Sequence, residues 1–387
     1  MHSCIFLTFG VMPSYLAKNR SLASALLCSL LFGLAGPSGL VPDAEAGSSK
    51  DKKKLKKLKK QSNALRITIV NLQAQLAAAR RPVPDPVPFV EMVTVGNVGN
   101  AADPEDGDNN TGGVQNYGAV PYVFQIGKYE VSLAEYTAFL NAVAAADTNS
   151  LYNASMGTDL NSAGIERSGA DGSYTYTVIG SGDRPVTYVS WFDCARFCNW
   201  LHNGRPTGVQ DGSTTERGAY TLDGATSGGL DIIVNRGAKF WIPSEDEWYK
   251  AAYHQPSGQG GDGDDYWIYP TGSNTVPGND IGPLPLANQV NHRTPDNNYS
   301  VTESSSYDSN QNYLTVGGSY EGSASFYGTF DQGGNVFEWN DAVIFSLFRG
   351  LRGGSWDNNE IILRSSFRNL DDPGLETGKI GFRIASP

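Results

Sequence analysis

Three segments of the chain share one pattern, in which a serine precedes an acidic residue by three positions and an apolar stripe follows. They are "SLAEYTAFLNAV" (132–143), "SWFDCARFCNWLH" (190–202) and "SEDEWYKAAYH" (244–254). A serine side chain accepts a hydrogen bond from a free backbone N–H at a helix start, and the acid faces the positive helix end. The pattern therefore predicts three amphipathic helices that begin directly after these serines.

Short apolar segments bounded by glycine, asparagine and aspartate lie between these helices, and such segments predict strands. They cover residues 122–131, 184–190, 238–243, 350–356 and 381–385. Two long polar connections, 145–183 and 255–315, are expected to be loops, and loops of that length are usually functional or held by ions. From 89 to 387 the pattern thus predicts one compact, loop-rich α+β domain.

A different period precedes this domain, because apolar or small residues there alternate in steps of three and four. The positions are Leu55, Leu58, Ser62, Leu65, Ile69, Leu72, Leu76 and Ala79. This heptad seam predicts a basic coiled-coil stalk over 47–80 that self-associates through 55–79. The alternative is a solvated, fraying helix. "RPVPDPVP" (81–88) then predicts a stiff proline-rich linker.

The N-terminal 46 residues have the order of a secretory signal. Lys18 and Arg20 precede an apolar run over 22–36, and "AEA" follows at 44–46. This arrangement predicts a cleaved signal peptide over 1–46 and an exported protein, whether periplasmic, at the cell surface or secreted. A membrane anchor is the alternative, but the run is shorter than the roughly 20 residues that a spanning helix needs. The true start at Met1 or Met12 stays open.

Charge is divided unevenly along the chain. Before Phe89 stand 13 of the 29 basic residues and only 4 of the 40 acidic ones, so the body carries a formal charge of about −20. An acidic body repels nucleic acid and suits divalent cations, although the acidity also serves solubility. The eight lysines between Lys50 and Lys60 predict contact with an anionic surface, such as phospholipid or an acidic polymer.

Two cysteines remain if the signal is removed, Cys194 and Cys198. They are four residues apart on one predicted helix, which is poor geometry for a disulfide, so we expect two buried thiols. His202, His254 and His292 lie far apart in the sequence and show no metal-ligand spacing.

Six blocks in fixed order make the body recognisable. They are "IGKYEVSLAEYTAFLN", "RPVTYVSWFDCARFCNWL", "AKFWIPSEDEWYKAAY", "YGTFDQGGNVFEWND", "RGLRGGSW" and "GFRIA". In this order they resemble the sulfatase-modifying factor family, whose type member is the formylglycine-generating enzyme. The resemblance covers nearly all of 89–387 and implies a domain related to the C-type lectin fold.

Active members of the family place two cysteines after the GGSW-like turn, where the thiolates hold copper(I). Here the two slots fall near Asn358 and Leu363, and Ser355 matches an active-site serine of the family. Copper(I) prefers soft thiolates, which neither side chain supplies. We therefore do not expect copper or formylglycine generation. The expected function is a non-catalytic binding or surface module, and the alternative is a family enzyme with an unrecognised active site.

The resemblance also implies structural calcium. One site would use Asp331 and Glu338 with the backbone carbonyls of Gly334 and Val336. The alternative is a tight turn held by hydrogen bonds alone. A second and weaker set consists of Asn288, Gln289, Asp308 and Asn310.

Two further groups of side chains leave two interpretations open. The arginines of the terminal block either form internal ion pairs or clamp an anionic substrate; they are Arg352, Arg364, Arg368 and Arg383. Aromatic residues of the long loop either stack on a glycan or peptide ligand or cover the core; they are Tyr266, Trp267, Tyr269 and Tyr299.

Overall fold

A computed structural model describes residues 89–104, 107–108, 113–114, 116–282 and 285–387. The predicted signal peptide, coiled-coil stalk and linker lie outside the described residues. Within the described part of the chain, no helix is long and apolar enough to cross a membrane.

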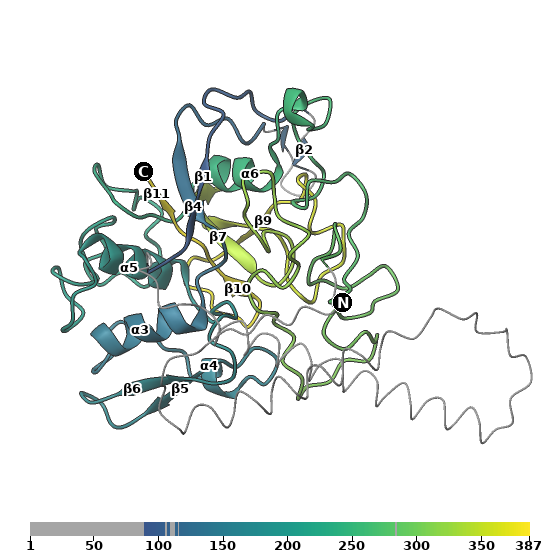
Figure 1. Ribbon diagram of the computed structural model, residues 1–387. Coiled ribbons are helices and arrows are strands. Elements are labelled where there is room, and N and C mark those ends of the chain that lie inside the picture. The colour runs from purple at the N-terminus through teal and green to yellow at the C-terminus, as the bar shows by residue number, and fades with distance from the viewer. Residues whose placement is uncertain (1–88, 105–106, 109–112, 115, 283–284) are drawn as a thin grey trace, which may run out of the picture. The chain divides into compact units, whose positions relative to one another are not determined.

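Two small sheets form the centre of the domain (Figure 1). The first has the order β1-β4-β11 and is antiparallel throughout. Its strands are β1 (Met92–Val95), β4 (Phe124–Gly127) and β11 (Ala385–Ser386). The second has the order β10-β7-β8-β9, with β10 parallel to β7 and the other pairs antiparallel. Its strands are β7 (Phe337–Ile344), β8 (Phe348–Arg352), β9 (Asn369–Asp371) and β10 (Ile380–Gly381). Both sheets therefore need the last residues of the chain.

Helices pack around these sheets. They are α3 (Leu133–Val143), α4 (Ser155–Thr158), α5 (Trp191–His202), α6 (Glu245–Tyr253) and the 3-10 helix η1 (Ser257–Gln259). The hairpin of β5 (Ile165–Ser168) and β6 (Thr175–Val178) lies beside α3, and β2 (Gly107–Asp108) pairs with β3 (Gly113–Val114). The main core joins α3 and α5 to Trp339, Leu351 and Phe382. The mixed α+β prediction for the domain is confirmed.

The three predicted helix starts are confirmed with their caps. Ser132, Ser190 and Ser244 each accept from the backbone N–H three residues on, and the acid there bonds back to the serine N–H. Each such cap satisfies two backbone donors that would otherwise lack a partner.

The strand predictions were less accurate. Segments 184–190 and 238–243 form no strand; each makes one isolated bridge, Ser132 to Pro185 and Trp241 to Ala385. A strand needs a neighbour with matching register, and these segments meet theirs at one residue pair. The 145–183 connection, expected to be a loop, contains α4 and the β5–β6 hairpin.

Asp193, the acid of the α5 cap, provides a test of this packing. Burial, with a smaller contribution from Glu376, raises its pKa to about 7. The folded state thus holds this proton more tightly than the unfolded state, so its contribution to stability is present below about pH 4 and is lost as pH rises through 7. Asp193→Asn keeps an acceptor oxygen and cannot ionise. As pH rises from 4 to 8, the unfolding free energy of the variant should increase by roughly 2–4 kcal/mol relative to that of wild type.

The measurement is urea denaturation of both proteins across this pH range. Ser244→Ala is the matched control, because it removes the corresponding cap hydroxyl at the start of α6 and leaves the partners of Asp193 in place; it should cost about 1 kcal/mol at every pH. A difference between Asp193→Asn and wild type that does not change with pH would contradict the account.

Candidate functional site

The turn after β8 positions Ser355 and Asn358, near which the first cysteine slot was expected. Gly353 and Gly354 have φ values of +92° and +76°. A Cβ on Gly353 would meet the Gln332 carbonyl oxygen at 2.6 Å, so only glycine fits there. Ser355 then lies buried, and its N–H and Oγ donate to Asn358 Oδ1 at 2.9 and 2.7 Å. Asn358 closes the turn with its amide oxygen.

An apolar side chain lies near the position expected for the second slot. Leu363 is fully buried and packs with Tyr269 and Val290. Its carbonyl accepts from the Tyr253 hydroxyl at 3.1 Å. The position expected to hold the second thiolate is thus part of the core.

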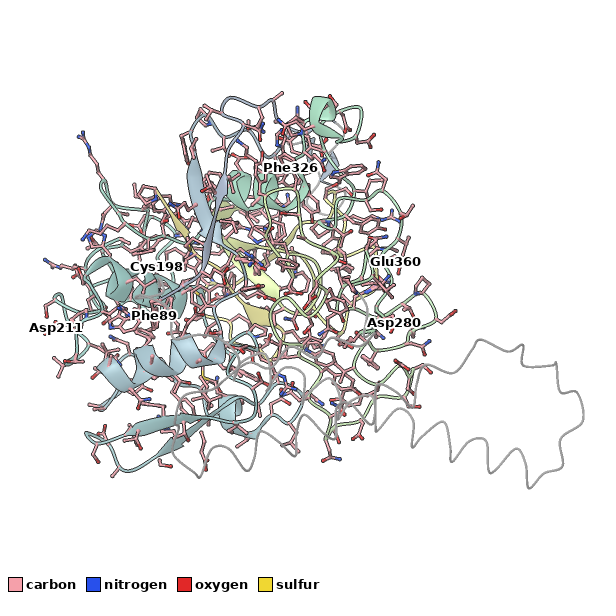
Figure 2. All side chains as sticks on the ribbon, in the orientation of Figure 1. Phe89, Cys198, Asp211, Asp280, Phe326 and Glu360 are labelled. Atoms are coloured by element: carbon pink, nitrogen blue, oxygen red, sulfur yellow. The ribbon has the colours of Figure 1, made fainter. Side chains whose placement is uncertain are left out.

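Cys194 and Cys198 belong to α5 and not to the terminal turn. Both are free and buried on α5, as predicted, and burial raises the pKa of both thiols. Figure 2 shows Cys198 and Glu360, a residue of the terminal block, on opposite sides of the domain. A protonated thiol in an apolar core is a poor copper ligand.

The histidines are also separate. Lys239 N–H donates to His202, while His254 and His292 contact the Tyr327 hydroxyl and the Val290 carbonyl. Among the described residues, no three His, Cys, Asp or Glu side chains are grouped as metal ligands.

A buried ion pair lies where the first calcium site was expected. Glu338 on β7 is fully buried, and Arg383 Nε and Nη2 donate to its two carboxylate oxygens at 2.6 and 2.7 Å. Trp248 Nε1 donates to the same carboxylate at 2.7 Å. The rest of the Arg383 guanidinium reaches the Gly127 and Phe330 carbonyls at 2.8 and 2.9 Å.

Two more carboxyl groups face this pair. Asp331 has a φ of +60° and accepts from the Gly318 N–H at 2.6 Å. Glu130 is 4% exposed; Asn335 Nδ2 donates to its Oε1 at 3.0 Å, and its Oε2 has no hydrogen-bond partner. We call Glu130, Asp331, Glu338 and Arg383 the charge centre.

The charge centre contains three carboxyl groups and one guanidinium. Burial raises the pKa of Asp331 to about 6, with Glu338 adding to the rise. Burial also raises the pKa of Glu130 well above its usual range, and the charges of Asp331 and Glu338 add to that shift. If all three ionise, two negative charges stay uncompensated, so the centre needs protons or another cation.

Sequence reasoning missed Glu130. The one signal was an acid inside the apolar block "YEV", directly before a helix cap. Its partner Asn335 is 205 positions away, so only the fold shows that it is buried beside Asp331.

The weaker calcium set is divided between two places. Asn288 accepts from Thr271 Oγ1 at 2.6 Å, and Gln289 Oε1 accepts from the Asp280 N–H at 2.9 Å. Asp308 instead accepts from the Asn310 N–H at 2.9 Å. None of the contacts described for these side chains joins one pair to the other.

The terminal arginines and the loop aromatics mostly make contacts inside the domain. Arg352 and Arg368 both donate to Glu245 at the start of α6, at 2.8 and 2.9 Å from their Nε atoms. With Arg383 they confirm the internal ion pairs, whereas Arg364 donates to the Tyr269 hydroxyl at 3.1 Å. Of the four aromatics, only Trp267 is not buried, which favours the core interpretation; the buried ones are Tyr266, Tyr269 and Tyr299.

Arg383→Met tests how far the domain depends on the charge centre. The change leaves buried carboxylates without their cation, which should cost about 3–5 kcal/mol of unfolding free energy. Arg217→Met is the matched control, because Arg217 pairs with Asp223 in an ion pair that is 65% and 54% exposed. It should cost less than about 1 kcal/mol. Equal losses in urea denaturation would contradict the assignment.

The chain was compared with known protein families and proteins. Residues 79–387 match the family model described as a sulfatase-modifying factor enzyme 1-like domain. No curated protein sequence matches the chain.

Several solved structures match the chain at low sequence identity. CarF is 20% identical, with 77% of this chain and 98% of that chain covered and a TM-score of 0.40. Treponema denticola variable protein 1 is 18% identical, with 79% and 99% covered and a TM-score of 0.42. PvdO from Pseudomonas aeruginosa is 17% identical, with 77% and 91% covered and a TM-score of 0.40. On the family match, which spans most of its length, the chain belongs to the sulfatase-modifying factor family.

Proposed function

We propose that this chain is an exported, non-catalytic member of its family, a binding or surface module rather than a formylglycine-generating enzyme. The observation that carries the proposal is the pair of side chains at the two positions where the resemblance implies cysteines. Asn358 is bonded to Ser355, and Leu363 is buried between Tyr269 and Val290. A site filled by an amide and an aliphatic side chain has no soft ligand for copper(I).

The proposal includes the N-terminal segments, on sequence grounds. A signal peptide over 1–46 exports the chain, the coiled coil over 55–79 assembles it, and Lys50–Lys60 contacts an anionic surface. The domain then presents loops on a fixed frame related to the C-type lectin fold, to a glycan or peptide ligand.

We further propose that calcium occupies the charge centre. Asp331 and Glu130 would hold it with the carbonyls of Gly334 and Val336, and the unpartnered Glu130 Oε2 supports this fit. Glu338 already accepts from Arg383 and Trp248, so Glu130 supplies charge that the expected set lacked. Oxygen ligands of this kind suit calcium, whose effect here would be to neutralise buried charge and stabilise the fold.

The copper part of the proposal is tested by returning the thiols. Wild type should bind no copper(I) in competition with a chromophoric chelator, and Asn358→Cys/Leu363→Cys should gain one tightly held ion per chain. Asn358→Ser/Leu363→Ala is the matched control, with small side chains and no sulfur. Stoichiometric copper(I) binding by wild type would overturn the proposal.

The calcium part is tested by thermal unfolding of the full chain after chelator treatment. Saturating calcium should raise Tm by about 5 °C, since a ligand at 100 times its Kd adds about 2.7 kcal/mol. Asp331→Asn should lose most of this shift, and the same change at the exposed Asp171 should keep it. Asp308→Asn changes a residue of the weaker calcium set and should also keep the shift in Tm. No shift in wild type, or equal loss in both control and test variants, would contradict the site.

A further inference from the structure

A surface cavity of about 380 Å³ lies between the start of β4, the segment before α6 and the middle of β7. Its walls include Tyr122, Val234, Trp241, Glu247 and Asp341. None of its lining residues belongs to the charge centre or to the terminal turn with the cysteine slots. It is therefore a separate feature that the family chemistry does not explain.

Two aromatic rings are held in place around the cavity by one buried carboxylate. The Tyr122 hydroxyl donates to Glu247 Oε1 at 3.0 Å, and Trp241 Nε1 donates to Glu247 Oε2 at 3.0 Å. Glu247 is 1% exposed and is itself fixed by the α6 cap. Tyr122 nevertheless leaves 48% of its surface exposed. Rings tied by their polar edges present preorganised faces to a ligand.

The cavity carries one net negative charge when Asp341 is ionised. Asp341 lines it and Glu247 closes its floor, while Arg349 donates to Asp341 Oδ1 at 3.0 Å and offsets one of the two charges. Burial raises the pKa of Asp341 to about 7, which a cationic ligand would oppose. Arg236 and Lys239 belong to the same segment, but neither lines the cavity.

Exposed apolar side chains, which we call the rim, stand close in sequence to the lining residues Val234 and Asp341. Arg349, the partner of Asp341, also donates to the Ile232 carbonyl at 2.7 Å and so ties the β7–β8 hairpin to the segment that carries Val234. The rim side chains are between 42% and 70% exposed; they are Ile233, Val343, Phe345 and Leu347. Phe345 and Ser346 form the hairpin tip with φ values of +52° and +54°, a strained conformation for residues other than glycine.

We infer that this cavity binds an ammonium group on an apolar stem, as in a lysine side chain of a partner chain. The aromatic faces would pack on the stem and attract the cation, Asp341 would pair with it, and the rim would receive neighbouring apolar residues. The inference rests on the proposed binding role and names the ligand class. A bound sugar would find aromatic faces too, but the net negative charge favours a cation.

The test titrates the full chain with Nα-acetyl-lysine methylamide, followed by ligand-observed NMR. The neutral isostere Nα-acetyl-norleucine methylamide has nearly the same stem without the charge, and should bind at least fivefold more weakly. Asp341→Asn and Tyr122→Ala should each weaken lysine binding at least fivefold. Tyr307→Ala, which changes a tyrosine that is 56% exposed and does not line the cavity, should leave it unchanged.

Equal binding of the two probes, no binding of the lysine probe, or loss of binding in Tyr307→Ala would each overturn the inference. Binding of neutral oligosaccharides that Tyr122→Ala abolishes, without lysine binding, would assign the cavity to sugars instead. If Asp341→Asn fails to fold, the half-exposed Tyr122 still tests the site. None of these outcomes changes the copper assay, so the two proposals fail separately.

Discussion

The structure depends on one buried guanidinium. Arg383 lies between β10 and β11, and its donors reach Glu338 on β7, the Gly127 carbonyl at the end of β4 and the Phe330 carbonyl. It thereby joins both sheets to the long connection before β7. A desolvated ion pair adds little net stability, but removing only one of its partners leaves an uncompensated charge in the core. The same constraint makes the two further carboxyl groups, Asp331 and Glu130, informative, because the protein keeps them beside a single cation.

Local signals in the sequence predicted local structure well. The three helix starts were read from a serine and an acid three residues apart, and such caps depend on neighbouring residues alone. Strands were harder, because Pro185 and Trp241 meet partners distant in sequence at one position each. The strand β7 was not predicted at all, since its asparagine and aspartate resemble a turn until the neighbouring β8 and β10 are known.

In the candidate site, too, contacts between residues distant in sequence could not be predicted. The resemblance placed the expected cysteine slots near Asn358 and Leu363, but the contacts of these two side chains could not be read from the sequence. The Ser355–Asn358 bond and the packing of Leu363 on Tyr269 required the fold. Glu130 and the cavity around Trp241 were missed, because each brings together residues more than a hundred positions apart. The family frame is thus retained, and Asn358 and Leu363 serve a turn and the core within it.

The most direct test of this account is mass spectrometry of a Cys-x-Pro-x-Arg peptide after incubation with the full chain, copper and a reductant, beside an active family member. The account predicts that the control converts the cysteine to an aldehyde and that this chain leaves it unchanged. Conversion by this chain would contradict the account, and would mean that the chemistry does not require thiols at positions 358 and 363.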